Sequence, residues 1–230
     1  MNGLQQKFTE IVYDSYFSGM QSTSNLRDEV RSHLLDQIRK GELKIGKTIN
    51  LAALARKIGI SVTPIREALS QLEQARIIEA IPNRGFIVTR LSQKEARDLY
   101  GTIAQLEVMA LENSSFDQED LEKLESKRLE LNQADNFMDK LHARFEFHKL
   151  LVHRCDNTVL LQILDDLKAR LHFYEYGFAR DTGFYANVDH QSVAIVEAIA
   201  EDNTPTAALI LKMNWMSVLE YVEKRILATA

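Results

Sequence analysis

Residues 51–89 read LAALARKIGISVTPIREALSQLEQARIIEAIPNRGFIVT, two short helical patterns followed by two short strand patterns. The first pattern, residues 51–58, places apolar side chains on one helical face and stops at Gly59. A second helix is predicted three residues later, with Thr63 as N-cap and Pro64 in the first turn, where a missing N–H costs nothing. A helix, a short turn with glycine and a capped second helix predict a helix-turn-helix.

The two faces of the second predicted helix differ in chemistry. One face is apolar and is expected to be core: Ile65, Ala68, Leu69, Leu72 and Ala75. Thr63, Arg66 and Ser70 point outward, where a helix in the major groove of DNA would present them to base edges. We therefore expect these three residues to face DNA. The alternative is that Arg66 pairs with Glu67 or Glu73 on a solvated face.

The end of the same segment predicts a β-hairpin. Residues 77–81 and 86–89 are strand-like, and Pro82-Asn83-Arg84-Gly85 between them is typical of a tight turn. A hairpin directly after a helix-turn-helix is a wing. We expect Asn83, Arg84 and Gly85 at its tip to contact DNA phosphates through a cation and accessible backbone amides.

The rest of the chain is helical in pattern. A helix is expected from Asn25 to Gly41, and Thr48-Ile49 is a candidate strand. Six more helices, separated by polar or glycine-containing joints, are predicted over 92–113, 118–132, 137–154, 158–178, 184–200 and 205–228. The predicted fold class is mainly α, an N-terminal winged helix-turn-helix followed by an all-helical antiparallel bundle. The expected domains are an N-terminal helical extension and linker (1–24), a DNA-binding domain (25–91) and an effector-binding and dimerisation domain (92–230).

Composition and charge limit the class of protein. The 230 residues include 45% hydrophobic side chains, enough for a core, and the single cysteine, Cys155, excludes an internal disulfide and a cysteine-cluster zinc site. No segment has the length and apolarity of a membrane helix, about 18 residues, and none reads as a secretion signal, so we expect a cytoplasmic protein without membrane contact. The net charge of −5 divides into +4 over residues 1–90 and −9 over residues 91–230. This division favours a basic module for an anionic partner, although chance could also produce it.

Residues 41–89 resemble the winged helix-turn-helix domain of GntR-type bacterial transcriptional regulators. The resemblance rests on the order and spacing of Thr63-Pro64-Ile65-Arg66-Glu67-Ala68-Leu69 and Pro82-Asn83-Arg84-Gly85-Phe86. The helical remainder is similar to the FCD-type effector domain of the FadR-like branch, in its six-helix, VanR-like form. The resemblance covers about residues 25–225 and implies a homodimer that binds a double-stranded DNA operator and responds to a small-molecule effector.

Two departures from the family concern DNA. Many relatives carry arginines where this chain has Val62 and Ala52. Two cationic contacts are therefore missing, which implies a weaker or altered base preference.

A further departure concerns a metal. FadR-like relatives often hold a divalent ion with an Asp and a His four residues apart and two later His, and here Arg144 replaces the Asp while His148 is retained. The second His falls at Ser192 or at His190, depending on the alignment, and the third falls near Asn214. Because a cation at this position opposes metal binding, we expect no cofactor; a divalent metal on the remaining ligands is the disfavoured alternative.

The same positions then suit an organic effector. We expect it to be bound by Arg144, His148 and Asn214, with His190 or Ser192, and Arg144 suits a carboxylate or phosphate. The alternative for His148 is a core histidine. Relatives also tend to carry an arginine where this chain has Ile103. A partly apolar ligand is favoured by this loss together with Trp215, Met213, Met216 and the aromatic run 173–178. The alternative for the aromatic run is that it belongs to the core or to a subunit interface.

The predicted function is a ligand-responsive transcriptional regulator rather than an enzyme. A metal-dependent helical-bundle enzyme is one alternative, but the only paired histidines, His148 and His153, lie five residues apart and diverge on a helix. An effector-independent DNA-binding protein is another.

Overall fold

The computed structural model describes residues 26–39, 42–43, 46–74, 76–82, 84–176, 188 and 190–228. The predicted N-terminal helix, Asn83 and residues 177–187 lie outside this set. The chain divides into two compact units between Arg90 and Leu91. In the portion of the chain that is described, no helix has the length and apolarity required to span a membrane.

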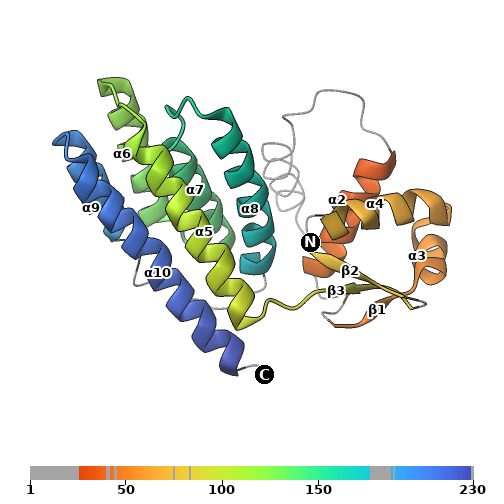
Figure 1. Ribbon diagram of the computed structural model, residues 1–230. Coiled ribbons are helices and arrows are strands. Elements are labelled where there is room, and N and C mark those ends of the chain that lie inside the picture. Colours follow the sequence, from red (N-terminus) through yellow and green to blue (C-terminus); the bar gives the residue numbers. More distant parts are fainter. Residues whose placement is uncertain are drawn as a thin grey trace. The chain divides into compact units, whose positions relative to one another are not determined.

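The first unit is a winged helix-turn-helix (Figure 1). Its elements in chain order are α2 (Leu26–Arg39), β1 (Thr48–Ile49), α3 (Leu51–Ile58), α4 (Val62–Gln74), β2 (Ile78–Ile81) and β3 (Gly85–Val88). The strands form an antiparallel sheet in the order β1-β3-β2, with Ala80 opposite Phe86. Helix α4 packs against α2 and α3, and its core side chains are buried: Ile65, Ala68, Leu69 and Leu72. The predicted apolar face of α4 is therefore the core of this unit, apart from position 75, which is not described.

Local sequence signals set the bounds of α3. The side chain of Asn50 accepts a hydrogen bond from the N–H of Ala53 at 2.9 Å, and Gly59 ends the helix with a φ of 73°, a left-handed conformation that suits glycine. The predicted N-cap at Thr63 is wrong, because α4 begins at Val62 and Thr63 is already helical. Pro64 still lies in the first turn, where an N–H is not required.

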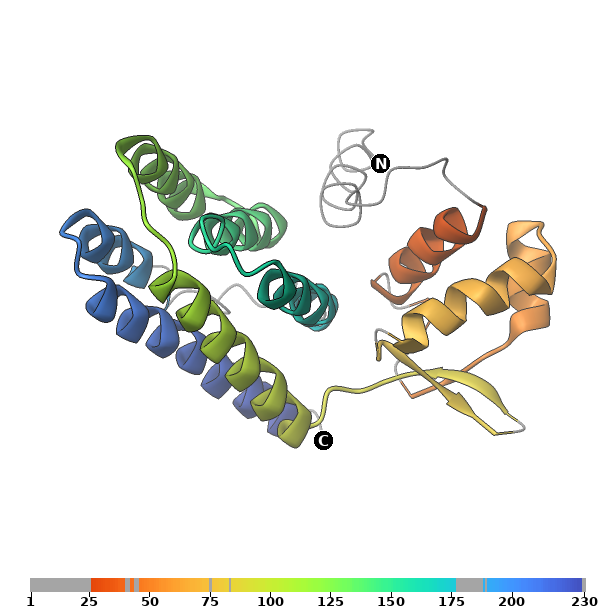
Figure 2. The ribbon, with the colours of Figure 1, turned by 45° about the horizontal axis from the view of Figure 1, so that its top comes forward.

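The second unit is a helical bundle, which confirms the predicted class (Figure 2). Its described helices are α5 (Gln93–Glu112), α6 (Gln118–Gln133), α7 (Phe137–Leu150), α8 (Thr158–Tyr176), α9 (Gln191–Ala200) and α10 (Thr204–Ala228). Helix α5 packs against α10 and α8, and α6 packs against α7 and α9. Arg97 near the start of α5 pairs with Glu223 near the end of α10, so these two helices are antiparallel.

Two helix bounds differ from prediction because tertiary contacts set them. Helix α7 ends at Leu150 and not at residue 154, where the Nδ1 atom of His153 lies 2.6 Å from the Leu150 carbonyl oxygen and its Nε2 atom lies 2.9 Å from Asp120 on α6. Helix α9 begins at Gln191 and not at residue 184. The side-chain amide of Asn214, on α10, donates to the carbonyl of Val188, which lies just before α9, and to the side chain of Gln191, the first residue of α9.

Candidate functional sites

The outward face of α4 carries the side chains that the sequence assigns to DNA. Thr63, Arg66 and Ser70 are exposed along one side of the helix. Arg66 forms no hydrogen bond or ion pair with any residue that the structure describes. One of its two alternative partners, Glu73, instead accepts a hydrogen bond from the backbone N–H of Ala80 at 3.0 Å. The guanidinium group is therefore available to an external partner.

The wing presents a second exposed cation. Arg84 is exposed, and its backbone N–H donates to the Ile81 carbonyl at 3.0 Å, which closes the turn. Gly85 has a φ of 92°, a conformation that strains residues with a side chain. Asn83, the third predicted tip residue, lies outside the described residues. Arg84 and Gly85 thus lie at the end of the wing, with the Arg84 side chain open to solvent.

The second unit buries a cluster of charged side chains around Glu107. Glu107 is fully buried, and Lys168 and His148 are each 2% exposed. The Glu107 carboxylate lies 2.5 Å from Lys168 Nζ and 2.7 Å from His148 Nδ1, and it accepts a hydrogen bond from Trp215 Nε1. One carboxylate therefore joins α5, α7, α8 and α10.

The protonation state of this cluster follows from burial and from neighbouring charge. Burial lowers the pKa of His148 to about 4, although Glu107 opposes this shift. Burial would raise the pKa of Glu107, but His148 and Lys168 together hold it below its usual range. At neutral pH a neutral His148 therefore donates its Nδ1–H to an ionised Glu107, because a carboxylate only accepts.

Arg144 and Asn214 adjoin this cluster. Arg144, 3% exposed, donates through Nη2 to the Asn214 side-chain oxygen, and its guanidinium lies 5.4 Å from the centre of the Trp215 ring. The His148 ring lies 4.6 Å from the same tryptophan, centre to centre. The structure thus brings three predicted effector residues, Arg144, His148 and Asn214, together around Trp215. Ser192 is buried on α9, whereas His190 is exposed at the start of that helix.

These residues do not fit a divalent metal. Arg144 and Asn214, at two of the positions that the resemblance assigns to metal ligands, are hydrogen-bonded to each other. His148 uses Nδ1 on Glu107, and no cluster of three His, Cys, Asp or Glu with metal-binding geometry occurs in the described part of the chain. His153, the other paired histidine, contacts Asp120 instead.

Sequence reasoning missed Glu107 and Lys168. The sequence pattern does contain a sign of both residues, because each interrupts a row of apolar residues at helical spacing. Glu107 lies four positions after Ile103 and four before Leu111, and Lys168 lies four positions after Leu164 and three before Leu171. A charged residue at an inward position requires a buried partner.

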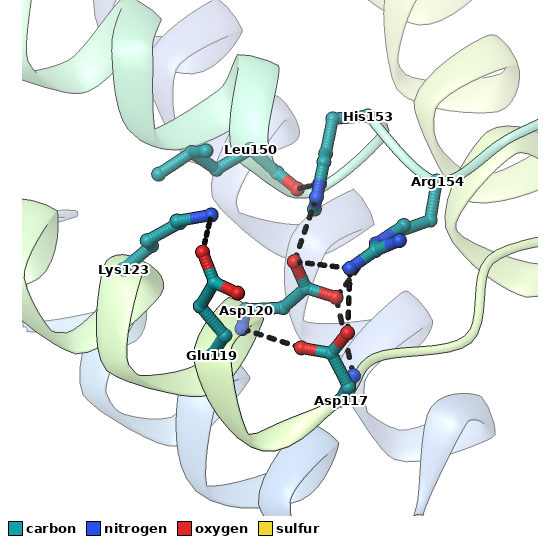
Figure 3. A network of polar contacts seen from close by, with 7 residues as sticks. All are labelled: Asp117, Glu119, Asp120, Lys123, Leu150, His153 and Arg154. Atoms are coloured by element: carbon teal, nitrogen blue, oxygen red, sulfur yellow. Dashed lines mark hydrogen bonds and ion pairs between the residues drawn. The ribbon is translucent and has the colours of Figure 1, made fainter.

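A separate polar network fixes the end of α7 that carries His148 (Figure 3). Asp120, on α6, accepts hydrogen bonds from Arg154 Nε at 2.7 Å and from the Asp117 N–H at 3.1 Å, and lies 2.9 Å from His153 Nε2. The side chain of Asp117 in turn accepts from the Asp120 N–H and so caps α6. Each of these hydrogen bonds joins residues of the second unit to each other, so the network holds α6 against the turn after α7.

Comparison with known proteins identifies both units. Residues 26–88 match the family described as bacterial regulatory proteins, gntR family, and residues 98–214 match the FCD domain. The chain is 32% identical over 150 residues to the HTH-type transcriptional regulator YdhC of Bacillus subtilis, a match that covers 62% of this chain and 66%, just under two thirds, of that protein. It is 26% identical to the HTH-type transcriptional regulator McbR of Escherichia coli over 67% of this chain and 72% of McbR. The solved structure of E. coli McbR/YncC has the same fold, with a TM-score of 0.69 at 20% identity over 88% of this chain and 99% of that one.

Proposed function

Since the chain belongs to the GntR family of bacterial regulatory proteins and is therefore a transcriptional regulator and not an enzyme, we propose that it binds a DNA operator as a homodimer. The chain also carries an FCD domain, and we propose that a small effector bound in this domain modulates DNA binding. Two winged domains related by a two-fold axis would read a short inverted repeat.

The observation that carries the DNA half of the proposal is the exposed, unpaired Arg66 on α4, beside exposed Thr63 and Ser70. A helix in the major groove directs such side chains to base edges, and an arginine can bind guanine through two hydrogen bonds. Arg84 and Gly85, with Asn83, would contact the phosphate backbone from the wing. The weak net charge of this half of the chain, +4, makes these specific contacts more important than bulk attraction.

The effector half rests on the buried cluster around Trp215. Arg144 offers a planar cation suited to a carboxylate, and the Trp215 ring offers an apolar surface beside it. We propose an organic acid, partly apolar, bound by Arg144, His148 and Asn214, with the buried Ser192 on α9 as a further candidate; His190 is left out because it is exposed. The effector changes DNA affinity only if it binds the DNA-competent and incompetent arrangements differently.

The DNA assignment is tested with a duplex selected from a randomised library by the wild-type protein. Arg66→Ala is expected to weaken binding of this duplex by about 1–3 kcal/mol and to relax preference at one base position. Lys212→Ala, which removes an exposed positive charge on α10, is the matched control and should bind as wild type. Full and selective binding by Arg66→Ala would contradict the assignment.

A further inference from the structure

Glu73 connects the helix that faces DNA to the wing. It lies in the last turn of α4, and its Oε1 atom accepts a hydrogen bond from the N–H of Ala80 on β2 at 3.0 Å. In the strand order β1-β3-β2, β2 pairs only with β3 among the described strands, so its outward N–H groups lack a strand partner. The Glu73 carboxylate satisfies one of these groups.

The bond lies close to the tip of the wing. Ala80 is opposite Phe86 in the β2–β3 ladder, and the tip residues Arg84 and Gly85 follow Ala80 by four and five positions. At this level β3 is also paired with β1, where Ile49 lies opposite Phe86, whereas β2 is the outer strand on the other side of β3 among the described strands. The Glu73 bond therefore fixes a point on the edge strand of the wing and restricts where the tip can lie.

The hydrogen bonds between the end of β3 and the α4–β2 turn hold the base of the wing. Thr89 Oγ1 donates to the carbonyls of Arg76 and Ile77, and the Thr89 N–H donates to the Ile77 carbonyl. These bonds tie the end of β3 to the turn between α4 and β2. The Glu73 bond differs from them because it runs directly from a side chain of α4 to the middle of a wing strand.

The Glu73 side chain offers both a negative charge and a hydrogen-bond acceptor, and the two have different consequences for DNA binding. A carboxylate on a domain that approaches phosphates lowers affinity through repulsion. A hydrogen bond to a strand amide does not need that charge, because a glutamine can accept through the same oxygen. The contribution of the acceptor can therefore be separated from the contribution of the charge.

We propose that Glu73 is a positioning residue for the wing: its bond to Ala80 fixes Arg84 relative to Arg66 on α4, so that the wing and the helix can engage one DNA site together. This inference rests on the proposed DNA binding. Glu73 itself would touch no DNA.

The test compares Glu73→Gln, which keeps the acceptor, with Glu73→Ala, which removes it, in the full chain with and without Arg84→Ala. Glu79→Ala is the matched control, since it removes an exposed carboxylate from β2. Affinity is measured for the duplex selected by the wild type, at a temperature at which thermal melts show every variant to be folded. Arg84→Ala is expected to weaken binding about tenfold in wild type and in Glu73→Gln, and less than about twofold in Glu73→Ala.

A global loss of structure would give a different pattern. It would weaken the contributions of Arg66 and Arg84 together, whereas a misplaced wing leaves the base preference set by Arg66 intact. If Arg84→Ala costs the same factor in Glu73→Ala as in wild type, the positioning role is wrong.

Amide hydrogen exchange, measured by NMR on the free protein, decides the role of Glu73 without DNA. The Ala80 N–H is expected to be protected in wild type and in Glu73→Gln and to exchange at least about tenfold faster in Glu73→Ala. If wild type selects no duplex, the proposed DNA binding fails, and the Ala80 exchange rate still tests the bond to the wing. Equal exchange in Glu73→Ala and Glu73→Gln would overturn the inference.

Discussion

Glu107 illustrates how much a single buried charge can constrain the bundle. Its carboxylate contacts Lys168, His148 and Trp215, so removal of its charge leaves the Lys168 ammonium group in the protein interior without its paired carboxylate. Breaking one partner of a buried ion pair costs far more than the pair itself contributes, because the remaining charge stays desolvated.

Glu107→Gln is therefore expected to lower the free energy of unfolding by about 3–5 kcal/mol. Glu112→Gln, an exposed position at the end of the same helix, should change it by less than about 0.5 kcal/mol. Urea unfolding at pH 7 measures both. Addition of Lys168→Met to Glu107→Gln should recover part of the loss, and a Glu107→Gln variant as stable as wild type would show that Lys168 has another partner.

The pKa of His148 predicts a loss of stability in mild acid. Its pKa is about 4 in the folded protein, below the ordinary value of about 6.5, so the unfolded chain binds a proton first as the pH falls. The stability contributed by the neutral ring is complete above about pH 6.5 and is lost progressively as the pH falls to 4. Urea unfolding at pH 7, 6 and 5 should show this decline, and His148→Gln should show a smaller one. His190→Gln, at an exposed histidine, should keep the wild-type slope; equal slopes in all three proteins would contradict the assignment.

At the scale of elements, prediction succeeded where the signal was local. The apolar face of residues 51–58 and the stop at Gly59 predict the bounds of α3, and two strand-like runs around a turn predict the β2–β3 hairpin. The end of α7 and the start of α9 were misplaced, because they depend on contacts of His153 with Asp120 and of Asn214 with Val188, which join residues far apart in sequence.

The buried polar cluster shows the same division between local and long-range information. Arg144, His148 and Asn214 were proposed from a resemblance, while Glu107 and Lys168, which interrupt apolar stripes, were overlooked. Helical spacing indicates that a charged side chain points inward, but it does not identify the residue that pairs with it. Glu107 and Lys168 are 61 positions apart, with helices α6 and α7 between them, so only the packing of α5 against α8 reveals the pair.

At the scale of the whole molecule, the proposed regulation requires that effector binding and DNA binding be coupled through free energy. If an effector changes DNA affinity by a given factor, DNA changes effector affinity by the same factor, and couplings of this kind are typically about 1–3 kcal/mol. The chain contains a single tryptophan, Trp215, which contacts the Glu107 carboxylate and lies beneath the Arg144 guanidinium. Its fluorescence therefore reports on the proposed effector site without a label.

A panel of short aliphatic and aromatic carboxylates, titrated against the 230-residue chain, is expected to contain ligands that change Trp215 emission and raise the melting temperature. Arg144→Gln should weaken the binding of such a ligand at least about tenfold, since a charge-assisted hydrogen bond is lost. Lys212→Gln, on the exposed face of α10, should leave the ligand affinity unchanged. The same ligand should change affinity for the selected duplex, and saturating duplex should change ligand affinity by the same factor. A carboxylate that shifts DNA affinity equally in wild type and Arg144→Gln would place the effector elsewhere. If no ligand that changes Trp215 emission alters DNA affinity, the chain acts as a DNA-binding regulator independently of this cluster.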